Sequence, residues 1–172
     1  MVEVFRNRQA WTVDLIMEAL SHGAFFDEDI LKAVHPGVQA FEDARHWDST
    51  HVLLPQIERV IRNIADRLGA RTQSYKSQTG ELHWASLKTL LEEPKVVDML
   101  AKVRADLARH LKSLLIDSRG LNLRDDACHG ILPPNVDAER IALLCILILL
   151  TVSMLVRPPT QAADVSTAES SS

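Results

Sequence analysis

The sequence predicts an all-α protein whose helices form a single up-down bundle. The chain has 172 residues, enough to bury a core within one domain. Apolar residues make up 47% of it, but aromatic residues only 5%, a balance that favours helices over a β-sandwich. Apolar residues also recur at helical spacing through most of the chain. We expect an N-terminal helical extension over residues 1–45, the bundle over residues 46–157 and a disordered tail over residues 158–172.

The first two helices are expected in the extension. Apolar residues at helical spacing predict a helix over residues 2–20, and Gly23 follows it as a stop. A second, short helix is expected over residues 25–34. The run His35-Pro36-Gly37 should end it, because proline lacks the backbone N–H and clashes with the preceding turn.

A longer helix is expected to end near Leu68. It begins near Val38 or Asp48, and its apolar stripe comprises Val52, Leu53, Ile57, Val60, Ile61, Ile64 and Leu68. Pro55 lies inside this stripe. Either the helix kinks at Pro55, or a new helix begins near Ser49 or Thr50 and the proline lies in its first turns.

The middle of the chain is expected to hold a polar connection and two further helices. Residues 69–83 are polar and predict a surface loop or a short hairpin. Helical spacing resumes over residues 86–91, and Glu92-Glu93-Pro94 marks a boundary. One helix is then expected over residues 94–116, with Arg119-Gly120 ending it.

The last expected helix is apolar on every side. Residues 141–156 carry no charge, and Asn135 or Asp137 could cap the helix that contains them. At 1.5 Å per residue this run measures about 24 Å, short of the roughly 30 Å of a membrane's hydrocarbon core. We therefore predict a buried bundle helix with Leu143, Leu144, Leu147 and Leu150 in the core, and keep a membrane-anchored chain as an alternative. The Ser/Thr/Ala-rich tail beyond it has a composition typical of disorder.

Charge and cysteine content limit the classes of function. The net charge of −4 gives no general attraction to nucleic acid. RNA contact would need a local basic patch, which six residues could form unless they are simply a solvated helix face. They are Lys102, Arg104, Arg109, Lys112, Arg119 and Arg124. Two cysteines form neither a zinc spacing nor a disulfide framework, and the N-terminus resembles no signal peptide, so a cytoplasmic location is expected.

The richest polar segment of the chain is Leu121-Asn122-Leu123-Arg124-Asp125-Asp126-Ala127-Cys128-His129-Gly130. A guanidinium binds phosphate through its planar donors, and an imidazole moves protons near neutral pH. Arg124 and His129 are thus candidate groups for RNA cleavage, which needs proton transfer and positive charge at the phosphorus. Asp125 could orient either side chain. The alternative is structural, with Arg124 paired to Asp125, Asp126 or a helix end and His129 capping the turn before Gly130.

The spacing of the two candidates restricts how they can act. Residues five apart on a regular helix point about 140° away from each other. Arg124 and His129 of one chain could therefore meet one phosphate only on an irregular helix or in a site shared by two subunits. The other histidines show no paired metal-ligand spacing, so we expect no metal and no cofactor.

The Arg-x4-His arrangement resembles the R-x4-6-H motif of the HEPN superfamily (higher eukaryotes and prokaryotes nucleotide-binding). A wider similarity covers roughly residues 51–156, where the runs from His51 to Glu58 and from Ser118 to Gly130 resemble two signature blocks of a family known only as a domain of unknown function. That family usually has Asn after the arginine and Ala before the histidine, where this chain has Asp125 and Cys128.

The resemblance implies a HEPN-like bundle that forms a homodimer with the motifs facing each other. In many such proteins it also implies a metal-independent endoribonuclease, with Arg124 and His129 catalytic and Asp125 as an aid. RNA and an antitoxin or other partner protein are the expected partners. The alternative function is a non-catalytic protein-interaction module, which could be the C-terminal part of a longer protein.

Overall fold

Eight helices and one short hairpin make up the described part of the chain, so the all-α prediction is confirmed. The computed structural model describes residues 12–75, 82–130 and 137–156. The elements are α1 (Val13–Ser21), α2 (Glu28–Glu42), α3 (His46–Arg67), β1 (Gln73–Tyr75), β2 (Leu82–Trp84), α4 (Leu87–Glu92), α5 (Pro94–Ala101), α6 (Leu107–Leu115), α7 (Leu123–Cys128) and α8 (Ala138–Ser153). The expected disordered tail lies outside the described residues.

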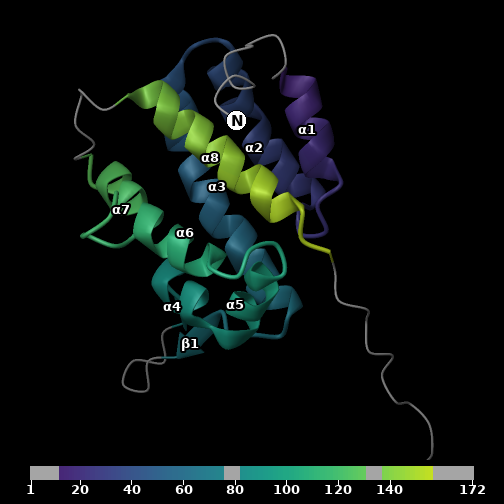
Figure 1. The fold of residues 1–172 in the computed structure, drawn as a ribbon, viewed down its shortest axis with the longest axis vertical. Coiled ribbons are helices and arrows are strands. Elements are labelled where there is room, and N and C mark those ends of the chain that lie inside the picture. The colour runs from purple at the N-terminus through teal and green to yellow at the C-terminus, as the bar shows by residue number, and fades with distance from the viewer. Residues whose placement is uncertain (1–11, 76–81, 131–136, 157–172) are drawn as a thin grey trace, which may run out of the picture.

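The long helix α3 is the centre of the bundle. Helices α2 and α8 pack along it, and α1 packs against both of them (Figure 1). Helices α4, α5 and α7 also contact α3, and α6 packs on α4, α5 and α7. One hydrophobic core joins residues of all eight helices, those of α1 and α2 included. The division into an extension, a bundle and a tail stays a prediction.

The apolar helix α8 is buried in the bundle, as expected. Asp137 caps it by accepting a hydrogen bond from the Arg140 N–H at 3.2 Å. Its buried face consists of Ile141, Ala142, Cys145, Ile146, Ile148, Leu149 and Val152. Within the described residues, no helix is long and apolar enough to cross a membrane.

The predicted buried face of α8 was wrong. Leu143, Leu144, Leu147 and Leu150 are only half-buried. A helix that is apolar on every side has no polar stripe to mark its outer face, so its sequence could not show which side turns toward the core.

The predicted break at His35-Pro36-Gly37 was also wrong, because α2 continues through it to Glu42. Ile30, Val34 and Val38 are spaced four apart across the proline and are all buried. Burying each such side chain contributes about 1.5–3 kcal/mol, which offsets the roughly 3 kcal/mol that an interior proline costs. Pro55 is likewise inside α3, nine residues after its start.

The hairpin was one of two expected alternatives, and the structure forms it. Strands β1 and β2 pair antiparallel, with Gln73 opposite Trp84. The single helix expected over residues 94–116 is instead two helices, α5 and α6. Between them the Asp106 carboxylate contacts the side chains of Arg104, Arg109 and His110. The Leu107 N–H donates to the Arg104 carbonyl at 3.0 Å, a three-residue turn that interrupts the four-residue hydrogen-bond ladder of an α-helix.

Gly120 sets the position of the segment that leads into α7. A Cβ at this residue would lie well inside contact distance of the Ser113 carbonyl oxygen on α6. The same oxygen accepts a hydrogen bond from the Leu121 N–H at 3.0 Å. Only a residue without a side chain allows this close approach of two backbone segments.

We therefore expect Gly120→Ala to lower the free energy of unfolding by about 3 kcal/mol, since a new methyl group must displace backbone. Urea denaturation followed by circular dichroism would measure this. Arg119→Ala is the matched control, because the Arg119 side chain is 90% exposed. Equal stability of the Gly120→Ala and wild-type proteins would show that the close approach is not needed.

Candidate functional site

The polar segment singled out in the sequence forms the short helix α7, which packs on α3 and α6. Asn122 precedes it in the left-handed region, with φ 47°, a conformation that asparagine tolerates better than most residues. The Asn122 amide donates a hydrogen bond to Asp126 at 2.8 Å, and the Asp126 N–H donates back to the Asn122 carbonyl at 3.0 Å. Leu123 is buried and anchors the helix in the core.

Arg124 is held by two carboxylates from different parts of the chain. Its Nη1 donates to Asp125 at 2.8 Å, and its Nε donates to Glu58 of α3 at 3.2 Å. The hydrogen bond with Asp125 is the main reason that the pKa of the guanidinium is raised, with burial opposing it and Glu58 adding to it. Arg124 thus pairs with Asp125, a contact that both the catalytic and the structural interpretation allow, and it is firmly cationic.

Glu58 links Arg124 to a second arginine. Its other oxygen pairs with Arg62 at 2.9 Å, and both of these side chains are less than one-fifth exposed. Arg62 also donates to the Ala85 carbonyl at 2.9 Å, and its guanidinium lies 5.4 Å from the ring centre of Trp84. This network ties the hairpin, α3 and α7 together.

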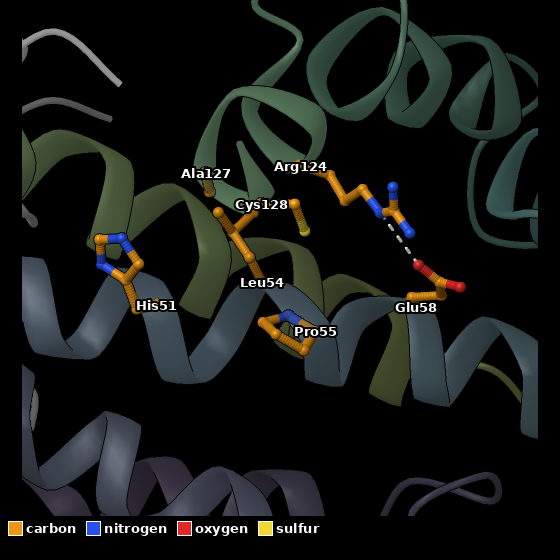
Figure 2. A pocket seen from close by; sticks show the side chains of 7 residues that line it. All are labelled: His51, Leu54, Pro55, Glu58, Arg124, Ala127 and Cys128. Carbon is orange, nitrogen blue, oxygen red and sulfur yellow. Dashed lines mark hydrogen bonds and ion pairs between the residues drawn. The ribbon is translucent and has the colours of Figure 1, made fainter. Parts of the chain in front are cut away.

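A pocket of about 320 Å³ lies between α3 and α7 beside Arg124. Its lining comes from one face of each helix: His51, Leu54, Pro55 and Glu58 of α3, and Arg124, Ala127 and Cys128 of α7. These residues have the i, i+3, i+4 spacing of a helix face. Figure 2 shows His51 at one end, the pair of Arg124 and Glu58 at the other, and the apolar side chains between them.

His129 is exposed at the C-terminal end of α7 and does not line this pocket. Its backbone N–H donates to the Asp125 carbonyl at 3.0 Å, which continues the turn of α7. The helix therefore keeps regular geometry up to His129. Its residues 124, 127 and 128 line the pocket, and residue 129 does not. One protomer does not bring Arg124 and His129 together in the pocket.

Most residues of the expected basic patch are paired with acidic side chains. Arg104 and Arg109 pair with Asp106, Lys112 with Glu92, and Arg119 with Asp117. Such pairing reduces the positive potential that RNA would meet at these helices. The described residues also contain no group of three or more His, Cys, Asp or Glu side chains that could hold a metal ion.

No family model, curated protein or solved structure matches this chain. The resemblance to HEPN proteins therefore stays a prediction from the Arg-x4-His motif and the two runs of the sequence that carry it.

Sequence reasoning found the α7 half of the site and missed the α3 half. Glu58 and His51 belong to the run that resembles a signature block, and the sequence alone assigns neither of them a role. Their signal was the spacing of positions 51, 54, 55 and 58, which share one face of a helix. Polar residues at both ends of that face, with Leu54 and Pro55 between them, are now seen to line the pocket.

Proposed function

We propose that this protein is a HEPN-like, metal-independent endoribonuclease that binds RNA at the pocket between α3 and α7. The observation that supports this most is the placement of Arg124, a cation fixed at one end of a pocket large enough for part of a nucleotide. Its two hydrogen bonds use only two of the five N–H donors of a guanidinium. Within the described residues, the Nη2 group makes no further hydrogen bond and is the donor offered to a phosphate.

In the proposed reaction the 2′-hydroxyl of RNA attacks the adjacent phosphorus. The 2′-oxygen–phosphorus bond forms while the bond from phosphorus to the 5′-oxygen breaks. Arg124 stabilises the negative charge that builds up on the phosphoryl oxygens, Asp125 and Glu58 hold its guanidinium in place, and the imidazole of His129 protonates the departing 5′-oxygen. The products are a 2′,3′-cyclic phosphate and a 5′-hydroxyl.

The exposed position of His129 supports a shared site. A two-fold homodimer with α7 near its axis would bring the partner subunit's His129 to the pocket that holds Arg124. Leu121, next to α7, is 56% exposed and would gain burial in such an interface. An antitoxin or other protein that covers α7 would block the same site.

The second candidate function is a non-catalytic protein-interaction module. The pairing of Arg124 with Glu58 and Asp125 favours this function, because the same contacts would hold α7 on α3 in a protein that does not bind RNA. The two functions differ in whether purified protein changes RNA.

Wild-type protein should cleave single-stranded RNA in excess EDTA, because the proposed reaction needs no metal. Denaturing gels would follow cleavage, and mass spectrometry should find 2′,3′-cyclic phosphate and 5′-hydroxyl ends. Light scattering in the same buffer should show a dimer at micromolar concentration. Folded protein that cuts no RNA across a broad panel of sequences would leave the interaction module as the function.

A further inference from the structure

The reaction proposed above needs a base for the 2′-hydroxyl as well as an acid for the 5′-oxygen. His129 supplies one of these groups, and the other has not been assigned. The pocket that contains Arg124 also contains a histidine of its own, His51 of α3. It lies at the end of the pocket opposite the pair of Arg124 and Glu58, and Figure 2 shows its ring beside the apolar middle.

The ring of His51 is held by its own helix. Its Nδ1 lies 2.8 Å from the carbonyl oxygen of Trp47, one turn earlier, and the two aromatic rings are 6.1 Å apart. A carbonyl oxygen can only accept a hydrogen bond, so Nδ1 is the nitrogen that carries the proton. In the neutral imidazole the lone pair is then on Nε2. His51 is thus oriented with its basic nitrogen away from the backbone.

The positions of His51 and Glu58 on α3 set how far the imidazole lies from the guanidinium along the pocket. His51 and Glu58 are seven residues apart, which places them on one face of the helix about 10 Å apart along its axis. Glu58 fixes the guanidinium of Arg124 at 3.2 Å. For His51 to reach the 2′-hydroxyl of a nucleotide whose phosphate is bound at Arg124, the ribose must lie along Leu54, between the two ends of the pocket. The other titratable groups that line the pocket are Glu58, Arg124 and Cys128.

We propose that Nε2 of His51 is the general base of this site. It accepts the proton of the 2′-hydroxyl as the 2′-oxygen attacks phosphorus, while the 5′-oxygen leaves with the electron pair of its bond to phosphorus and takes a proton from His129. Proton exchange with water restores both imidazoles. This inference rests on the proposed ribonuclease function, and it assigns the base to the same protomer as Arg124.

Two substrates distinguish a residue that acts as the general base from one that acts as the general acid. The first is an RNA that wild-type protein cleaves, and the second is a uridine 3′-phosphate ester whose leaving group is p-nitrophenol, which needs no protonation. We expect His51→Ala to slow both reactions by roughly 10²–10⁴-fold, the usual contribution of a general base. Loss of His129 should slow only the first. Added imidazole should restore part of the activity of the His51→Ala protein on both substrates.

His22→Ala is the matched control. His22 is exposed and its Nδ1 lies 2.7 Å from the carbonyl of Glu18, the same local contact as that of His51, but it does not line the pocket. This variant should cleave at the wild-type rate. A His51→Ala protein that cleaves both substrates at the wild-type rate would overturn the inference and leave the ribonuclease function standing. Slowing on RNA alone would make His51 an acid and overturn its assignment as base. Wild-type protein that cleaves neither substrate would refute the proposed function itself, and this inference with it.

Discussion

Arg124→Ala should lower the rate of RNA cleavage on the order of 10³-fold, because the developing charge on the phosphoryl oxygens then has no fixed cation beside it. Arg124→Lys should recover only part of this loss, since an ammonium keeps the charge without the planar pair of donors. Single-turnover cleavage in EDTA would measure both variants.

The Arg124→Ala protein should still fold. Glu58 keeps its ion pair with Arg62 at 2.9 Å, so the loss of Arg124 leaves no buried carboxylate without a partner. Circular dichroism and thermal denaturation would check this. Arg140→Ala is the control for loss of an exposed arginine outside both the expected basic patch and the pocket between α3 and α7. Cleavage by the Arg124→Ala protein at the wild-type rate would remove Arg124 from the mechanism.

His129→Ala should lower the rate by roughly 10²–10⁴-fold, the usual contribution of a general acid or base. Its fold should be unaffected, because the side chain is exposed and belongs to no core contact.

Mixing the His129→Ala and Arg124→Ala proteins tests whether the site is shared. In a two-fold dimer, half of the exchanged dimers are mixed and each has one complete site, so roughly a quarter of the wild-type activity should return. Subunit exchange must be demonstrated in the mixture. If the mixture is then no more active than either variant alone, the shared site is contradicted.

The fold could be predicted where the apolar residues formed a stripe that marked one face of a helix as buried. The stripe of α3 and the boundary at Pro94 were both found, and Asp137 was one of the two expected caps for α8. The sequence failed where tertiary burial opposed a local signal. Pro36 signals a break, yet the buried residues on either side of it keep α2 continuous.

The site could be predicted only in part, for a related reason. Arg124, Asp125 and His129 are close in sequence, so their chemistry is visible as a motif. Glu58 is 66 residues from Arg124, and its role depends on how α7 docks on α3. That docking depends on Gly120 lying against Ser113 and on the left-handed Asn122, which no spacing pattern reveals.

The most direct test of whether RNA occupies the pocket between α3 and α7 is an alkylation footprint of Cys128. This thiol is exposed and lines the pocket, whereas Cys145 is buried and its burial raises the pKa to about 12, so Cys145 should stay unmodified in folded protein. An RNA with 2′-O-methyl groups binds without being cleaved, because the attacking hydroxyl is blocked. We predict that saturating amounts of this RNA slow the alkylation of Cys128 by iodoacetamide, as measured by mass spectrometry. Alkylation of Cys128 at an unchanged rate while the RNA is bound would contradict the placement of the RNA site.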